Sequence, residues 1–199
     1  MKLPEKKYVA VILAHEKSGE LNTIENRPFL SLIPVAGRPM LEWVVRAVHQ
    51  SETVSSIIII GPDEINDLYC RKFIDIQINN TGITVDKIIE MLPQFSEARN
   101  QSGDFSPQNR FIFLSSSSIL TAPENINSLI KVFDEHAYPI AVVATNAETF
   151  IDNNFIPAFT FRNSGRLAVP AGIVLIKDAL MFSRAIAKLN TVILHKSRM

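Results

Sequence analysis

Short apolar runs rich in β-branched residues alternate along the chain with segments of helical periodicity. The runs YVAVILA (8–14), SSIIIIG (55–61), RFIFL (110–114) and PIAVVAT (139–145) have strand length and are largely apolar. Continuous apolar strands are typical of a parallel sheet that is covered on both faces, whereas FIDIQI (73–78) alternates and favours an outer strand. The pattern therefore predicts an α/β fold with a mostly parallel central sheet and helices on both faces.

Helical periodicity fills the segments between these runs. Residues 39–50 begin with a proline suited to a first helical turn, and the apolar face predicted for this helix consists of Met40, Trp43, Val44, Ala47 and Val48. After Thr121-Ala-Pro-Glu124, which has capping-box spacing, the expected stripe consists of Ile126, Leu129, Ile130 and Phe133. Further helices are predicted over 63–70, 83–95 and 179–189, the last capped by Asp178.

The last third of the chain changes pattern. FIPAFTF (155–161) and AGIVLIK (171–177) read as two strands joined by a turn around Gly165, which predicts an antiparallel addition to the sheet. The polar segment 96–109 is expected to be a surface loop. No internal repeat is found, and we expect residues 1–199 to form a single domain.

Composition narrows the class of protein. Hydrophobic residues make up 47% of the chain, and 20 basic residues balance 20 acidic ones, so nucleic-acid binding driven by phosphate neutralisation is not expected. No apolar stretch approaches the ~20 residues that span a bilayer, and residues 1–14 lack a signal-peptide cleavage pattern. The single cysteine, Cys70, excludes an intrachain disulfide framework and is expected to be packed rather than reactive. We expect a cytoplasmic protein with no membrane partner.

The connection from His15 to Arg38 is far longer than the about 2–6 residues usual after a strand in such folds. It contains the cations Lys17, Arg27 and Arg38, which can contact phosphate oxygens. Two interpretations remain, a ligand-binding loop beside the main pocket or a solvated loop with scattered charges. In the first, Arg38 is expected to outweigh Arg27, because it precedes a helix N-terminus.

The sequence also resembles a known family, through VAVILAHEKSGE (9–20), PVAGRPMLEW (34–43) and VSSIIIIGP (54–62). These segments resemble the nucleotidyltransferase superfamily with a Rossmann-like, glycosyltransferase-A-like fold, especially its molybdenum-cofactor guanylyltransferase-like branch, over about residues 8–177. The resemblance implies transfer of a nucleotidyl group from an NTP to a phosphorylated acceptor. It implies a nucleotide pocket formed by Ala14, His15, Lys17, Ser18, Gly19, Arg27 and Arg38.

The chain departs from this family at the positions that bind phosphate and metal. Where the family has a glycine-rich Leu-Ala-Gly-Gly-x-Gly-x-Arg, residues 13–20 read LAHEKSGE, and a carboxylate there repels phosphate. The family's metal-binding aspartate corresponds to Ser116 or Ser117, and its later Gly-Asn to Ala171–Gly172. Mg²⁺ is therefore expected as a cofactor only if the protein is active. No catalytic residue and no metal ligand is assigned.

Several functions stay open at this point. The leading hypothesis is a nucleotidyltransferase-like protein, either active or degenerate. The alternatives are a non-catalytic protein that binds a nucleotide or sugar phosphate, and a structural or regulatory subunit, for example a homodimer. An active enzyme would need a relocated metal ligand such as Asp104, Glu124 or Asp152. The serines at 115–118 lack a nucleophile elbow, and the four histidines lack zinc-ligand spacing.

Overall fold

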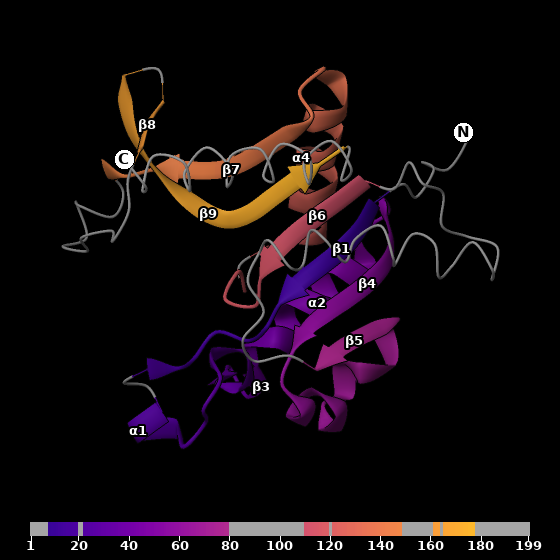
Figure 1. The fold of residues 1–199 in the computed structure, drawn as a ribbon, viewed down its shortest axis with the longest axis vertical. Helices are drawn as coiled ribbons and strands as arrows, with labels where there is room; N and C mark the ends of the chain where they lie inside the picture. Colours follow the sequence, from indigo (N-terminus) through magenta and orange to yellow (C-terminus); the bar gives the residue numbers. More distant parts are fainter. Residues whose placement is uncertain are drawn as a thin grey trace, which may run out of the picture.

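A mixed seven-stranded sheet organises the computed structural model, which describes residues 8–19, 22–79, 110–119, 121–148, 161–163 and 165–177. The strands run in the order β5-β4-β1-β6-β9-β7, with β8 paired to β9 (Figure 1). Strands β1, β4, β5 and β6 are parallel, and β9 is antiparallel to β6, β7 and β8. The bounds are β1 Tyr8–Leu13, β4 Val54–Gly61, β5 Ile76–Asn79, β6 Arg110–Ser115, β7 Ile140–Asn146, β8 Phe161–Asn163 and β9 Arg166–Ile176.

This topology confirms the predicted fold class. The parallel strands are the apolar runs of the sequence, and β5 lies at the edge of the sheet as its alternation indicated. Strands β8 and β9 form a hairpin in which Asn163 pairs with Arg166, so the predicted turn around Gly165 is also confirmed. Gly165 has a φ of 83°, a left-handed conformation that glycine adopts without steric cost.

The helices that the structure describes differ widely in length. The two longest that the structure describes are α2 (Met40–Gln50) and α4 (Pro123–Glu135). Short elements fill the connections: α1 (Asn22–Glu25), the 3-10 helices η2 (Leu30–Leu32), η3 (Asp63–Asp67) and η4 (Tyr69–Phe73), and the hairpin of β2 (Pro34–Val35) with β3 (Arg38–Pro39). Every helix in the described part of the chain is too short or too polar to span a bilayer.

Both faces of the central strands β1, β4 and β6 are largely buried. One apolar cluster unites the side chains on one face of β1, such as Ala10 and Ile12, with the buried faces of α2 and α4. A second cluster on the opposite face contains Val9, Val11 and Phe113. Because alternate residues of β1 enter different clusters, the strand is buried on both sides, and each large apolar side chain contributes about 1.5–3 kcal/mol.

Three local predictions are wrong. The segment 63–70 forms the two 3-10 helices η3 and η4 rather than one helix. Trp43 is half-buried rather than in the core, because its indole Nε1 donates a hydrogen bond to the Val35 carbonyl at 2.9 Å. Helix α4 begins at Pro123 with Ala122 as an N-cap that makes no side-chain hydrogen bond, so Thr121 does not cap it. The predicted helices 83–95 and 179–189, the cap at Asp178 and the loop 96–109 lie outside the described residues.

Candidate functional site

The carboxyl ends of β1, β4 and β6 lie together at one edge of the sheet. Leu13 at the end of β1 is in register with Ile60 on β4 and with Ser115 on β6. Two backbone hydrogen bonds continue this alignment past the strands, from Ala14 N–H to the Ile60 carbonyl at 2.7 Å and from Ser116 N–H to the Leu13 carbonyl at 3.0 Å. Ligands of open α/β sheets bind outside such an edge. We therefore take this carboxyl edge as the candidate site.

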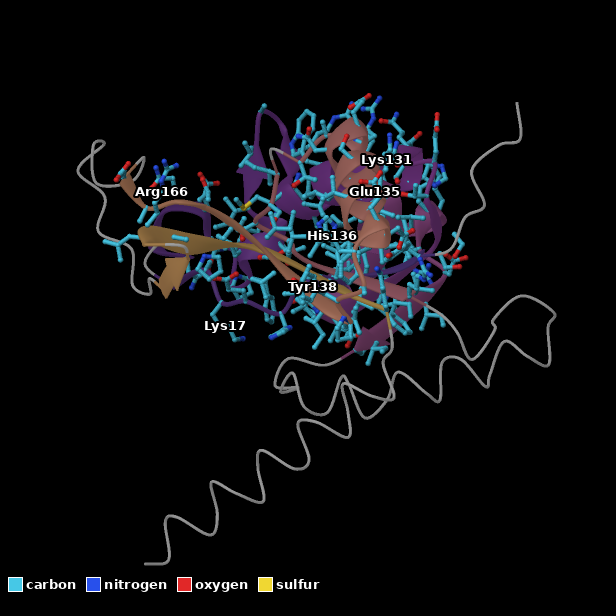
Figure 2. All side chains as sticks on the ribbon, turned by 90° about the horizontal axis from the view of Figure 1, so that it is seen from above. Lys17, Lys131, Glu135, His136, Tyr138 and Arg166 are labelled. Carbon is cyan, nitrogen blue, oxygen red and sulfur yellow. The ribbon has the colours of Figure 1, made fainter. Side chains whose placement is uncertain are left out.

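Two chain segments extend beyond the carboxyl edge on either side of it. In Figure 1 the connection that contains α1 and β3 lies below the ends of the parallel strands, and the β8–β9 hairpin lies above them. Figure 2, turned about the horizontal axis, shows Lys17 and Arg166 toward the same end of the molecule. The long connection after β1 thus leaves from the carboxyl edge, as the sequence predicts.

A turn of four serines follows β6 at this edge. Ser115 Oγ and Ser117 Oγ are hydrogen-bonded to each other at 2.6 Å, and the Ser118 N–H donates to the Ser115 carbonyl at 3.1 Å. Ser116 is fully buried, with 0% exposure, and its Oγ has no hydrogen-bond partner, whereas Ser117 is exposed. The two candidate equivalents of the family aspartate are therefore in opposite environments.

Gly172 of β9 lies directly against the serine turn. A Cβ placed on it would stand 3.3 Å from Ser115 Cβ and 3.3 Å from Ser118 Oγ, and its φ is 71°. The pairing register of β9 with β7 is irregular around this residue. Only glycine fits this conformation without strain. The structure therefore brings Gly172 against the turn 115–118, the two segments in which the resemblance places the family's metal-binding positions.

A large cavity adjoins the serine turn. It has a volume of about 870 Å³ and lies between the β6–α4 connection, the helix α4 and the strands β7 and β9. Ser117, Ser118 and Ala171 line one side of it, and Leu129 and Val143 line another. This cavity was missed by sequence reasoning, because its walls come from four elements that no local motif connects. Its size falls within the about 300–1,000 Å³ usual for small-molecule sites.

The loop after β1 is tied into a short ribbon. Lys17 and Phe29 form an isolated antiparallel bridge, and the Lys17 ammonium lies 4.0 Å from the centre of the Phe29 ring. The Ser18 N–H donates to the Pro28 carbonyl at 3.1 Å, and the Ser18 hydroxyl donates to the Arg27 carbonyl at 2.5 Å. Both donors of Ser18 are thus satisfied within the protein, in contrast to the free backbone donors of a glycine-rich phosphate loop.

His15 stands between this ribbon and the sheet. It is half-buried, and its Nδ1 has no hydrogen-bond partner. The preceding residue, Ala14, is held in place because its carbonyl accepts a hydrogen bond from the buried Ser31 hydroxyl at 2.9 Å. With Ser116 Oγ, His15 Nδ1 is one of three buried side-chain polar atoms left unpaired in the described residues. Because buried polar groups are normally satisfied, these atoms are polar positions that lack a partner within the described residues.

The predicted nucleotide-binding residues occupy three places. Ala14 and His15 lie at the carboxyl edge itself. The ribbon after β1, with the loop that closes it, contains Lys17, Ser18, Gly19 and Arg27. Arg38 instead lines a separate cavity of about 500 Å³ between α2 and η4. Cys70 lies in the wall of that cavity, where burial raises the pKa of its thiol to about 12, which confirms a packed cysteine.

The residues at the carboxyl edge do not fit a Mg²⁺ site. Mg²⁺ is usually held by one or two protein carboxylates, whereas Ser115 and Ser117 offer neutral hydroxyls that already bond to each other, and Gly172 offers no side chain. Within the described ranges, no group of three or more His, Cys, Asp and Glu side chains is placed to hold a metal ion.

Similarity to known proteins is found in the structure of the chain. No protein-family model and no curated protein matches the chain. A hypothetical transferase from Thermus thermophilus superposes with a TM-score of 0.66 at 18% identity, covering 96% of this chain and 74% of that one. The 4-diphosphocytidyl-2C-methyl-D-erythritol synthase of Anaerococcus prevotii DSM 20548 superposes with a TM-score of 0.60 at 15% identity, covering 94% and 76%.

A third similar structure was solved with a nucleotide. CMP:2-keto-3-deoxy-manno-octonic acid synthetase, complexed with CTP, superposes with a TM-score of 0.56 at 14% identity, covering 86% of this chain and 74% of that one. At such identities the likeness concerns the fold. This chain therefore shares the α/β fold of these transferase, synthetase and synthase structures.

Proposed function

We propose that this chain is a nucleotidyltransferase-like protein that binds a nucleotide or another phosphorylated small molecule at the carboxyl edge and does not carry out metal-assisted nucleotidyl transfer. The observation that carries the proposal is the serine turn against Gly172. It occupies the positions that hold metal ligands in the family the sequence resembles, and it supplies hydroxyls in place of carboxylates.

Ligand binding is supported by the polar atoms left at the edge. His15 Nδ1 is unpaired on the loop that leaves β1. The hydroxyl-bearing residues Ser117, Ser118 and Thr121 line the adjoining cavity of about 870 Å³, which has room for an oxygen-rich ligand. Lys17 contributes positive charge from the exposed side of the ribbon.

The absence of transfer follows from electrostatics. Nucleotidyl transfer depends on cations that neutralise the phosphate oxygens as charge develops. The exposed Glu16 near this edge adds a negative charge instead. Lost charge stabilisation costs several kcal/mol in the transition state, and each 1.36 kcal/mol lowers the rate about tenfold.

Pyrophosphate release and nucleotide binding, measured side by side, test this proposal. With each of the four common NTPs and Mg²⁺, we expect no pyrophosphate release above background, while calorimetry detects nucleotide binding. His15→Ala should weaken that binding about tenfold through the lost polar contact, and His136→Ala, on an exposed histidine after α4, should not change it. Robust Mg²⁺-dependent turnover would overturn the absence of transfer, and equal binding by the two variants would overturn the site.

The proposal extends to the nucleobase of the bound nucleotide. The resemblance of the segments 9–20, 34–43 and 54–62 to the molybdenum-cofactor guanylyltransferase-like branch favours a guanine nucleotide, although two of the similar structures are named for cytidylyl products or were solved with CTP. We therefore expect GTP to bind more tightly than CTP. Tighter binding of CTP would remove this chain from the guanylyltransferase-like branch and leave the binding function intact.

A further inference from the structure

We propose that the groove between α2 and η4 is a second ligand site, which binds an organic phosphate that carries a planar ring, such as a nucleoside monophosphate. This α2–η4 groove has a volume of about 500 Å³ and shares no lining residue with the cavity beside the serine turn. It is therefore a site additional to the carboxyl edge.

Positive charge collects in the α2–η4 groove. Arg38 and Arg46 line it, and the Lys72 ammonium donates a hydrogen bond to the Tyr69 hydroxyl at 2.6 Å. Neither arginine forms an ion pair with any residue that the structure describes. One carboxylate lines the groove, that of Glu42, and it accepts a hydrogen bond from the Tyr69 N–H at 3.1 Å. Cations thus exceed carboxylates, which favours an anionic ligand.

The charges of the groove act on one exposed aromatic ring. Tyr69 is 67% exposed, although large aromatic side chains normally bury most of their surface. The pKa of its phenol is lowered, first by the hydrogen bond and the charge of Lys72 and then by Arg38 and Arg46. The Lys72 ammonium also lies over one face of the Tyr69 ring, 3.8 Å from its centre, so a ligand would contact the opposite face.

Stacked rings form the floor of the groove. The His49 and Phe73 rings are stacked with centres 4.2 Å apart, and Tyr69 meets Phe73 edge-on at 6.4 Å. Such a platform binds the face of a planar ring, and stacking of one base on an aromatic side chain contributes about 1–3 kcal/mol. Cations and stacked rings side by side suit a ligand that has a phosphate at one end and a ring at the other.

The backbone fixes Arg38 in the groove. The β2–β3 hairpin turns through Ala36 and Gly37, whose φ angles are 50° and 79°. A positive φ at an alanine is sterically unfavourable and persists only where the surroundings enforce it. Here the Trp43 indole of α2 donates to the Val35 carbonyl and holds the hairpin against the helix. The backbone position of Arg38 is thus set before any ligand binds, which lowers part of the cost of binding.

The size of the groove favours a small molecule over a protein partner. A volume of about 500 Å³ lies within the about 300–1,000 Å³ usual for small-ligand sites. A stable protein interface instead needs a contact of about 800 Å² on each partner.

The single tryptophan gives a local reporter for this site. The Trp43 ring lies 5.7 Å from the Arg38 guanidinium, so its one indole N–H resonance should shift when a phosphate binds at Arg38. We expect AMP to shift this resonance in a saturable way and to bind about tenfold more tightly than ribose 5-phosphate, which lacks the base. Tyr69→Leu should reduce the preference for AMP and retain binding of the phosphate.

A matched pair of variants tests the charge. Arg46→Gln on α2 should weaken AMP binding about tenfold, whereas Lys131→Gln, which removes an exposed cation from α4 (Figure 2), should not change it. His15→Ala, which reports on the carboxyl edge, should leave the Trp43 shift intact. A wild-type protein whose Trp43 resonance does not respond to AMP, or equal responses of Arg46→Gln and Lys131→Gln, would overturn the proposal.

Discussion

Restoring a carboxylate to the serine turn should succeed at one position and fail at its neighbour. Ser117 is exposed and lines the large cavity, whereas Ser116 is fully buried. The structure therefore predicts that Ser117→Asp presents a carboxylate to a bound nucleotide and its Mg²⁺, and that Ser116→Asp does not. From the sequence alone, either Ser116 or Ser117 could correspond to the family aspartate.

The two substitutions should differ strongly in stability. A surface change such as Ser117→Asp typically alters the free energy of unfolding by less than about 0.5 kcal/mol. Ser116→Asp adds atoms to a closed space, which costs about 1–3 kcal/mol, and adds an ionisable group whose burial costs several kcal/mol unless it stays protonated. Burial should raise the pKa of an aspartate at 116, and its neutral form is a poor ligand for Mg²⁺.

Urea unfolding and nucleotide calorimetry measure these effects. We expect Ser117→Asp to unfold at the wild-type urea midpoint and to bind NTP about tenfold more tightly with Mg²⁺ than without, a difference of about 1.4 kcal/mol. Ser116→Asp should unfold at a clearly lower midpoint and show no such gain. A stable Ser116→Asp variant with the Mg²⁺ effect, beside a Ser117→Asp variant without it, would refute the reasoning.

Three further predictions follow from contacts in the structure. Gly172→Ala should lower the free energy of unfolding by about 1–2 kcal/mol, because alanine is strained at a φ of 71°; an unchanged urea midpoint would contradict this. Burial, and then Asp134, raise the pKa of Tyr8 above its ordinary value of 10.0, so stability should be fully present below pH 10 and fall as the pH rises above it, a fall that Tyr8→Phe should reduce in pH-dependent urea unfolding. Arg38→Ala should weaken phosphate-ligand binding about tenfold and Arg27→Ala less than twofold, since Arg38 lines the α2–η4 groove and Arg27 lines neither cavity described above; calorimetry showing the reverse order would contradict this.

The sheet could be predicted from the sequence because its signal is local. Val9 and Ala10 enter opposite clusters, and a strand buried on both faces must be apolar at every position. The hairpin at Gly165 could also be predicted from the sequence, because a turn with a positive φ favours glycine. The start of α4 was misjudged by one residue, because Pro123 fixes the first turn and forces Ala122 into extended backbone before any hydroxyl can cap the helix.

The candidate sites depend on contacts that the sequence does not show. The ribbon between Lys17 and Phe29 joins residues of an irregular loop by a single bridge, which has no periodic pattern. The α2–η4 groove brings Arg38 and Arg46 to Tyr69 across the surface of a helix. One signal was available for it, since Arg46 lies on the polar face of a helix whose other face is apolar. The charge of that face alone does not reveal the aromatic rings beside it.

Calorimetric titration of the wild-type protein with GTP, in the presence and in the absence of Mg²⁺, tests the central claim most directly. The claim is that the carboxyl edge of this nucleotidyltransferase-like fold binds nucleotide without a metal site. It predicts saturable binding with dissociation constants that agree within about twofold under the two conditions, because the serine turn gives Mg²⁺ no carboxylate. Binding that appears only with Mg²⁺, or that tightens more than tenfold when Mg²⁺ is added, would contradict it.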